Sequence, residues 1–139
     1  MSISKVGVIG AGQMGNGIAH VFALAGFDVR LQDISTEALE NAGEIIRRNM
    51  NRQMAHGSID ENDISAALGR VEMTTDLSSL GASDLVIEAA TEREAVKQAI
   101  FDELLPHLKP ETILTSNTSS ISITRLASRT DRPEKFMGF

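Results

Sequence analysis

Cysteine is absent from the sequence, proline occurs only three times in 139 residues, and no long apolar run is present. The lack of cysteine excludes disulfide bonds and thiolate chemistry, and it is compatible with a reducing cytoplasm, which is the location we expect. The apolar runs fall far short of the ~20 residues that a transmembrane helix needs. The first ten residues, MSISKVGVIG, lack the charged start and cleavage site of a signal peptide. No membrane association is expected.

The sequence also contains fewer positively charged than negatively charged residues. Thirteen lysine and arginine residues against 19 aspartate and glutamate residues give a formal net charge of −6. This balance argues against nucleic acid or an anionic membrane as a partner. The hydrophobic content of 42% and the charged content of 23% are those of an ordinary globular protein. We expect residues 1–139 to form one domain.

Strand-like and helix-like segments alternate along the chain. Short apolar runs predict strands at residues 6–9, 29–33, 71–74, 85–89, 112–116 and 136–139. Helices are predicted between them at residues 13–25, 35–56, 60–68, 91–109 and 122–128. The alternation predicts an α/β fold of Rossmann type, which is a doubly wound parallel sheet with right-handed crossovers. Residues 35–69 are then a long helical hairpin inserted after the second strand.

The spacing of apolar residues predicts which helix faces are buried. In the first helix the apolar stripe is Met14, Ile18, Val21, Phe22 and Ala25. In a later helix, which begins with a capping-box pattern of Thr91 and Glu94 and ends before Pro110, the stripe is Val96, Ala99, Ile100, Leu104 and Leu108.

The segment GAGQMG, residues 10–15, fits the pattern G-x-G-x-x-G. It follows a predicted strand, opens a predicted helix and precedes an acidic residue, Asp33, at the end of the next strand. In such a loop Gly10 permits the tight turn, Gly12 lets the backbone approach a diphosphate, and Gly15 lets helix and strand pack closely. The helix start then faces the phosphate with its free N–H groups. We predict that Gly10, Ala11, Gly12, Gln13, Met14 and Gly15 bind a dinucleotide.

Asp33 favours NAD over NADP. At this position a carboxylate accepts hydrogen bonds from the adenosine ribose and repels a 2′-phosphate. Arg30 is the nearby cation that could favour NADP instead, but it lies inside the strand and not after the acid. No cluster of metal ligands stands out, and NAD is the cofactor we expect.

Small polar residues fill the segment TSNTSS, residues 115–120, where a predicted strand opens into a turn. In parallel α/β sheets ligands lie outside the carboxyl ends of the strands. Asp33 and residues 90–92 are predicted to lie at the same edge. The alternative is that these hydroxyl groups only cap the following helix.

Together, GAGQMG, the long insert after Asp33, IEAATERE at residues 87–94 and SNTSSISI at residues 116–123 resemble one family. They are similar to the amino-terminal domain of the 3-hydroxyacyl-CoA dehydrogenases, in particular the bacterial 3-hydroxybutyryl-CoA type. The resemblance covers essentially the whole chain. Its discriminating feature is SNTSS combined with E-A-x-x-E, since many dehydrogenases share the glycine loop.

The resemblance implies roles for further residues. Ala90 and Glu92 would lie along the cofactor near the nicotinamide ribose, with Lys97 close by. Ser119 would bind the 3-oxygen of the substrate beside the nicotinamide, and Asn117 would help to shape that pocket. Open alternatives are a solvated Lys97, a Glu92 favoured by the helix dipole, and a Ser119 that caps a helix.

The family's reaction is the oxidation of 3-hydroxyacyl-CoA to 3-ketoacyl-CoA, in which a histidine oriented by a glutamate removes the hydroxyl proton. The resemblance implies that this histidine, in an H-F-x-N-P motif, would follow directly after Phe139. We therefore expect a Rossmann domain truncated at its carboxyl end, without the helical carboxy-terminal domain through which the family dimerises, and nearly inactive by itself. His20, His56 and His107 are not predicted at the site.

The helical insert is where this family contacts the CoA part of an acyl-CoA substrate. The corresponding positions hold Asn49 and His56, and Arg48, Arg52 and His56 share one helix face. The alternative is an ordinary solvated helix whose acidic residues precede its arginines.

Two rival functions remain open at this point. One is a 3-hydroxyisobutyrate or 6-phosphogluconate type dehydrogenase, which shares the glycine loop with Met14 but usually lacks the hairpin and the SNTSS segment. The other is a non-catalytic module that binds NAD.

Overall fold

The computed structural model describes residues 3–90, 93–117 and 130–138, and within the last range it leaves out the side chains of residues 133 and 136–138. Its elements, in chain order, are β1 (Lys5–Ile9), α1 (Gln13–Leu24), β2 (Asp28–Gln32), α2 (Thr36–Ala55), α3 (Glu61–Arg70), β3 (Val71–Thr74), η1 (Leu77–Ala82), β4 (Leu85–Glu88), α4 (Glu94–Leu104), η2 (Leu105–His107), β5 (Ile113–Ser116), η3 (Pro133–Lys135) and β6 (Phe136–Gly138).

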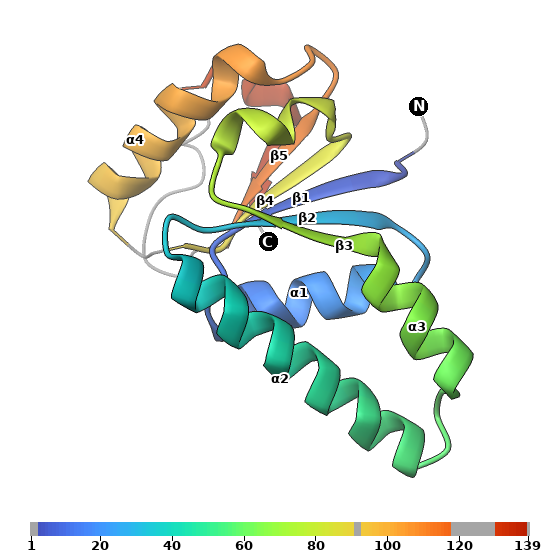
Figure 1. Ribbon diagram of the computed structural model, residues 1–139. Coiled ribbons are helices and arrows are strands. Elements are labelled where there is room, and N and C mark those ends of the chain that lie inside the picture. The colour runs from blue at the N-terminus through green and yellow to red at the C-terminus, as the bar shows by residue number, and fades with distance from the viewer. Residues whose placement is uncertain (1–2, 91–92, 118–129, 139) are drawn as a thin grey trace.

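Six strands form one sheet in the order β3-β2-β1-β4-β5-β6, and every neighbouring pair is parallel. The strand order reverses between β1 and β4, which is the topological switch point where doubly wound sheets bind ligands. Helices α1, α2 and α3 cover one face of the sheet, and α4 and η1 cover the other (Figure 1). The predicted Rossmann-type fold and the helical hairpin after β2 are confirmed.

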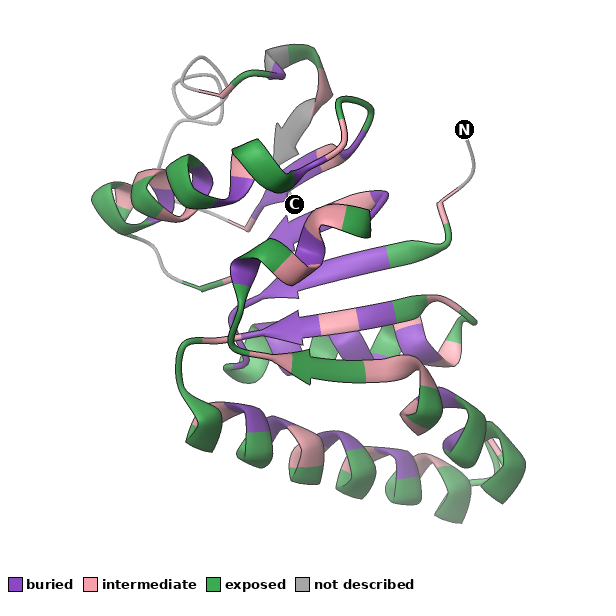
Figure 2. Ribbon diagram, turned by 45° about the horizontal axis from the view of Figure 1, so that its top comes forward, coloured by how far each residue is buried: buried purple, intermediate pink, exposed green. Residues whose placement is uncertain are grey.

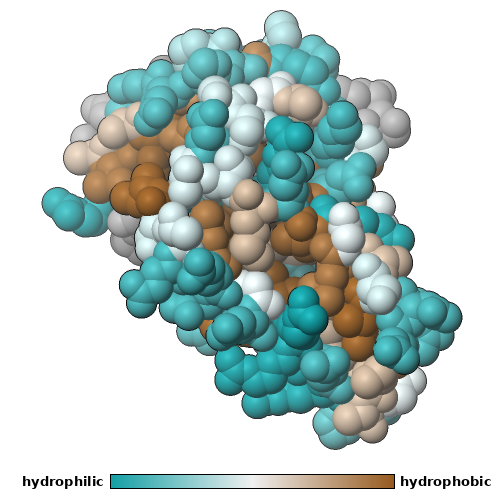
Figure 3. All heavy atoms as spheres, in the orientation of Figure 1, coloured by the Kyte–Doolittle hydropathy of each residue, from teal (hydrophilic) through white to brown (hydrophobic). Residues whose placement is uncertain are grey.

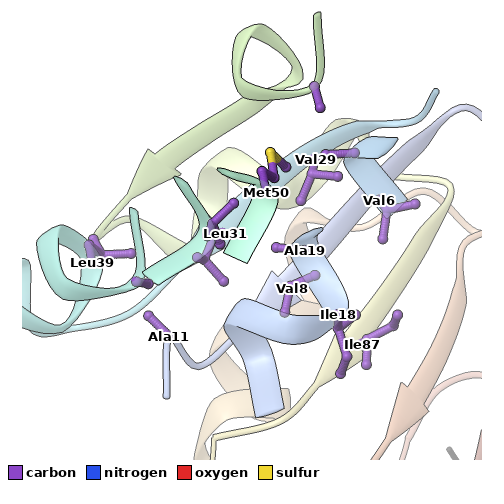
Figure 4. Packing of buried hydrophobic residues seen from close by; sticks show 14 of the residues in the cluster. Val6, Val8, Ala11, Ile18, Ala19, Val29, Leu31, Leu39, Met50 and Ile87 are labelled. Atoms are coloured by element: carbon purple, nitrogen blue, oxygen red, sulfur yellow. The ribbon is translucent and has the colours of Figure 1, made fainter. Parts of the chain in front are cut away.

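Alternating residues of the central strands fill a separate core on each side of the sheet. Val8 and Leu31 point towards α1 and α2, where they meet Ala19 and Met50 (Figure 4). On the other face a second core of eight buried residues contains Ile9, Leu77, Leu80, Val86, Phe101, Leu104, Leu108 and Leu114. Among the strands whose side chains are described, β1 to β5, burial is greatest in the middle of the sheet and least at β3 (Figure 2). The carboxyl ends of β1 and β4 are therefore held rigidly from both sides.

The buried faces of two helices match the prediction only in part: Ile18, Leu104 and Leu108 are buried as predicted, and other residues of the two stripes are not. In α1 the small residues Gly15, Ala19 and Ala23 face the sheet, whereas Met14 and Val21 are 51% and 65% exposed. In α4 the buried residues are Lys97, Phe101 and Leu104, while the apolar residues one position earlier lie nearer the surface. Close packing on the sheet selects small residues at these positions of α1, whereas Ile18 fills the core beside them and Met14 and Val21 turn outward.

Several boundaries also differ from the prediction. Helix α3 runs through Gly69 and ends at Arg70, where the chain enters β3 directly. Helix α4 begins at Glu94 and not at Thr91, which lies outside the described residues. It ends at Leu104 because Pro106 lacks an amide hydrogen, and a single 3-10 turn follows. The helix predicted at residues 122–128 also lies outside the described part.

Candidate functional site

The first turn after β1 is so tightly packed that the fold itself requires glycine at two of its positions. Gly10 has a φ of +102°, and a Cβ atom there would lie 2.7 Å from the Cα atom of Ala90. A Cβ atom on Gly15 would lie 1.6 Å from the carbonyl oxygen of Gly10. A side chain at Gly10 would collide with the backbone that follows β4, and a side chain at Gly15 would push α1 away from the glycine loop.

Gly12 is different, because the protein does not need a glycine there. Its φ is −71°, which any residue adopts, and no described atom lies within 4 Å of the Cβ atom that it lacks. It is the N-cap of α1, yet no described side chain caps this helix and its first turn holds no acidic residue. The open space and the uncapped N–H groups together fit an anionic group at the helix start.

Asp33 lies beside the glycine loop, just after β2. Its Oδ2 atom accepts a hydrogen bond from the Ala11 N–H at 2.8 Å, and its Oδ1 atom accepts one from the Ser35 N–H at 2.9 Å. The carboxylate is partly exposed and keeps lone pairs for a ligand. Arg30 does not approach it, because its guanidinium forms an ion pair with Glu72 at 3.3 Å and donates to the Ser79 carbonyl.

A pocket of about 330 Å³ opens next to Asp33. Most of its wall is apolar and comes from the ends of β1 and β2 and from α4. The apolar surface over α4 is visible at the left of Figure 3. Its lining includes Gly10, Ile34, Leu77, Ala90, Val96 and Ile100. Ile34, at the mouth of this pocket, is 90% exposed. An apolar pocket beside a carboxylate and a glycine loop fits an adenosine.

At the ends of β4 and β5 lies a polar cluster that the sequence did not reveal. Glu88 and Lys97 form an ion pair, and both side chains are completely buried. Lys97 was predicted to lie beside the nicotinamide ribose, but its ammonium group points into the interior, where it also donates to the Asn117 carbonyl at 3.2 Å. The one signal in the sequence was Glu88 at the end of an otherwise apolar strand, since Lys97 lies among other charged and polar residues of α4.

The remaining predicted residues are placed only in part. Ala90 is exposed and lines the apolar pocket, and Asn117 is half-buried at the end of β5. Glu92 and Ser119 lie outside the described residues. The predicted roles of these residues stay predictions.

A second opening separates the start of α1 from α2. Its volume is about 670 Å³, and amide side chains line it, among them Gln13, Asn16, Asn41 and Asn49. Arg52 and His56 follow Asn49 at spacings of three and four residues, so they continue along the same flank of α2. Both are exposed. Arg48, one position before Asn49, is exposed as well.

All three histidines lie away from the carboxyl edge of the sheet. His20 is buried in α1, where a hydrogen bond of 2.7 Å joins its Nε2 atom to Oε1 of Gln53 in α2. His56 caps the far end of α2, and His107 is exposed in η2. None of them can reach a substrate at the end of β5.

Metal and membrane features are absent from the described ranges. In residues 3–90, 93–117 and 130–138 no three metal-ligating side chains come together. Within these same ranges no helix is both long and apolar enough to cross a lipid bilayer.

The strand order, the glycine loop at the switch point and the carboxylate after β2 define a dinucleotide-binding domain of Rossmann type. Comparison with protein families identifies it further. Residues 5–139 match the family described as "3-hydroxyacyl-CoA dehydrogenase, NAD binding domain". The chain belongs to this family, and NAD is its cofactor.

Known relatives agree with this membership. The chain is 56% identical over 136 residues to 3-hydroxybutyryl-CoA dehydrogenase of Bradyrhizobium diazoefficiens, covering 98% of this chain and 46% of that protein. It is 44% identical to 3-hydroxyadipyl-CoA dehydrogenase of Escherichia coli, covering 99% of this chain and 29% of that protein.

Among solved structures, (S)-3-hydroxybutyryl-CoA dehydrogenase of Ralstonia eutropha superposes with a TM-score of 0.95 at 40% identity. The match covers 99% of this chain and 48% of that one. The chain thus spans about half the length, or less, of the relatives named here.

Proposed function

We propose that this chain is the cofactor-binding part of an NAD-dependent 3-hydroxyacyl-CoA dehydrogenase that interconverts 3-hydroxyacyl-CoA and 3-ketoacyl-CoA. The observation that carries the proposal is the open space at Gly12, where the protein has no need of a glycine but a diphosphate does. Relatives named for 3-hydroxybutyryl-CoA and 3-hydroxyadipyl-CoA support the substrate class. A short-chain substrate of the 3-hydroxybutyryl type is our first choice.

The cofactor would lie across the carboxyl ends of the strands. Its adenosine would occupy the pocket beside Asp33, and its diphosphate would rest on the N–H groups at the start of α1, between Gly12 and Met14. The nicotinamide would then reach the ends of β4 and β5, near Ala90 and Asn117. Bound NAD supplies the hydride acceptor, and the protein holds it in place.

The resemblance to the family supports two further roles beyond the described residues. Ser119 would donate a hydrogen bond to the 3-oxygen of the substrate, and Glu92 would contact the nicotinamide ribose. Asn117 would complete the substrate pocket from the end of β5. An alanine at Ser119 should lower turnover in a full-length homologue more than it weakens NADH binding.

Preference for NAD over NADP follows from Asp33. Its charge would repel a 2′-phosphate, and the nearest cation in the strand, Arg30, is engaged with Glu72 and Ser79. Calorimetry should show at least tenfold tighter binding of NADH than of NADPH, which is about 1.4 kcal/mol. An Asp33→Asn variant should narrow that ratio, whereas Glu37→Gln, which neutralises an exposed acid in the first turn of α2, should leave it unchanged. Equal affinities in the unaltered chain would refute the assignment.

The groove between α1 and α2 would receive the CoA part of the substrate. Asn49 lines this groove, and Arg52 and His56 lie further along the same flank, where a guanidinium can pair with phosphate. An Arg52→Ala variant should bind CoA more weakly, with less dependence on salt, while NADH binding stays the same. Arg47→Ala, on another side of α2, is the control. CoA affinity that is equal in both variants would remove Arg52 from the site.

The base of the reaction would have to come from outside residues 1–139, since His20, His56 and His107 lie away from the strand ends. The chain alone should bind NADH yet reduce acetoacetyl-CoA at a small fraction of the rate of a full-length homologue. Comparable rates would refute this. A full-length protein that binds NADH but does not reduce acetoacetyl-CoA would favour the non-catalytic module.

The wider setting is also proposed from the family. The complete enzyme would act in fatty acid metabolism, in β-oxidation, in the cytoplasm, and as a homodimer. The acyl-CoA names of the relatives support the metabolic role. Size-exclusion chromatography of the full-length protein with light scattering would test the dimer.

A further inference from the structure

Glu88, the last residue of β4, and Lys97, in the first half of α4, form an ion pair with no exposed surface on either side chain. Lys97 occupies a core position of α4, because Phe101 and Leu104 follow it on the same buried face. The pair sits directly beneath the edge of the sheet where the nicotinamide half of the cofactor is proposed to lie.

Among the described residues, the other side-chain hydrogen bonds of this pair lead to the ends of the two strands. Glu88 Oε2 accepts from the Ala90 N–H at 2.7 Å, and Glu88 Oε1 accepts from the Ser116 hydroxyl at 2.7 Å. Lys97 donates to the Asn117 carbonyl at 3.2 Å, while the Asn117 N–H donates to the backbone carbonyl of Glu88 at 2.8 Å. The pair therefore fixes the peptide groups of Ala90 and Asn117, both of which border the proposed nicotinamide position.

An ion pair is a costly way to fill this space. Removing two charges from water carries a large penalty, and apolar residues of similar volume often stabilise a fold equally well. Phe101 and Leu104 demonstrate that the same face of α4 accommodates apolar side chains. Apolar residues would not supply the hydrogen-bond donor to the Asn117 carbonyl that Lys97 provides, or the acceptor for the Ala90 N–H that Glu88 provides. The pair therefore serves to orient the peptide groups of Ala90 and Asn117 rather than to stabilise the fold.

We propose that Glu88 and Lys97 are positioning residues for the nicotinamide half of the cofactor, a role that rests on the proposed function. They hold Ala90 and Asn117 in the orientation that receives the nicotinamide ribose and ring. Ala90 also lines the proposed adenosine pocket, so it borders both halves of the site. Asp33 and the start of α1, which are proposed to bind the ribose and the diphosphate, have no hydrogen bond to the pair among those described. Loss of the pair should therefore weaken binding of the whole dinucleotide much more than binding of its adenosine diphosphate part.

The test compares NADH with ADP as ligands of the 139-residue chain. The double variant Glu88→Gln/Lys97→Met removes both charges together, so that neither is left buried without its partner. Titration calorimetry should show NADH affinity lowered about tenfold or more, with ADP affinity within about twofold of the unaltered chain. A merely structural role would weaken both ligands alike or neither, and an unchanged ratio of the two affinities overturns the proposal.

A matched control lies at the opposite ends of the same strands. Asp84 and Lys109 form an ion pair at 2.6 Å near the start of β4 and before β5, far from the proposed cofactor. Asp84→Asn/Lys109→Met should lower the melting temperature and leave the NADH to ADP ratio unchanged. If the Glu88 and Lys97 double variant does not fold, Ser116→Ala removes one donor to Glu88 and should shift the ratio in the same direction. If the unaltered chain binds NADH no more tightly than ADP, the nicotinamide half adds no affinity. That result would refute the proposed function itself and not only the role of the pair.

Discussion

Replacing Gly12 with alanine should separate folding from cofactor binding. The added Cβ atom meets no described atom within 4 Å, and the backbone already has a φ of −71°. Lower entropy of the unfolded chain favours the alanine by about 0.4–1 kcal/mol, and the loss of a good N-cap residue costs a similar amount. The free energy of unfolding should therefore change by less than about 1 kcal/mol.

Binding should respond quite differently. The Cβ atom would occupy the space through which a diphosphate approaches the N–H groups at the start of α1. Hydrogen bonds to charged groups contribute about 1.5–3 kcal/mol each, so the loss of one lowers NADH affinity by about 2 kcal/mol, or roughly 30-fold. The sequence contains neither tryptophan nor tyrosine, so a fluorescence titration of NADH has little protein background.

Gly17 provides a matched control in the same helix. A Cβ atom there also has no described neighbour within 4 Å, but the residue lies five positions after Gly12, beyond the first turn of α1 whose N–H groups are proposed to bind the diphosphate. Gly17→Ala should stabilise α1 by about 1 kcal/mol, which raises the melting temperature by roughly 3–5 °C, with little change in NADH affinity. If Gly12→Ala binds NADH as tightly as Gly17→Ala, the diphosphate does not lie against this turn.

Three further outcomes are expected for stability. Gly15→Ala places a Cβ atom 1.6 Å from the Gly10 carbonyl oxygen and should destabilise the fold by about 3 kcal/mol or more, as measured by urea unfolding. Phe101→Ala empties a fully buried position and should cost about 3–5 kcal/mol in the same assay. Asp84→Asn removes a carboxylate whose pKa lies below its ordinary value of 3.8, chiefly because the Lys109 ammonium donates to it. The stabilisation by this carboxylate is present above that ordinary value and is lost as the pH falls through the folded-state pKa. The difference in melting temperature between the unaltered chain and Asp84→Asn should therefore be large near pH 7 and small towards about pH 2. A gap that does not depend on pH would contradict this.

The order of strands and helices could be predicted from sequence because periodicity and glycine placement are local signals. All six strands lie where apolar runs predicted them, within a residue or so at their ends. The glycine loop and Asp33 also come together as their spacing predicted, since strand ends of a parallel sheet share one edge. These features depend on short segments of the chain.

The buried faces of α1 and α4 could not be predicted in the same way. Apolar spacing identifies a surface that avoids water, but it does not say whether protein or ligand covers that surface. Met14 and Val21 face outward, and Val96, Ala99 and Ile100 line the proposed adenosine pocket. In both helices the sequence pattern combined the core face with an apolar outer flank.

The role of Lys97 needed three-dimensional information. Its partner Glu88 lies in a different element, and either residue alone would pass for a surface charge. Ser119, which was predicted to bind the substrate, belongs to the segment from residue 118 to residue 129, and this segment lies outside the described residues. Its part in the site therefore stays a prediction from the motif.

The most direct test is a crystal structure of this chain grown with NAD. The diphosphate should accept hydrogen bonds from the N–H groups of the first turn of α1, with the adenosine ribose on Asp33 and the nicotinamide towards the end of β5. A dinucleotide bound elsewhere, or bound with its phosphates turned away from Gly12, would contradict the account.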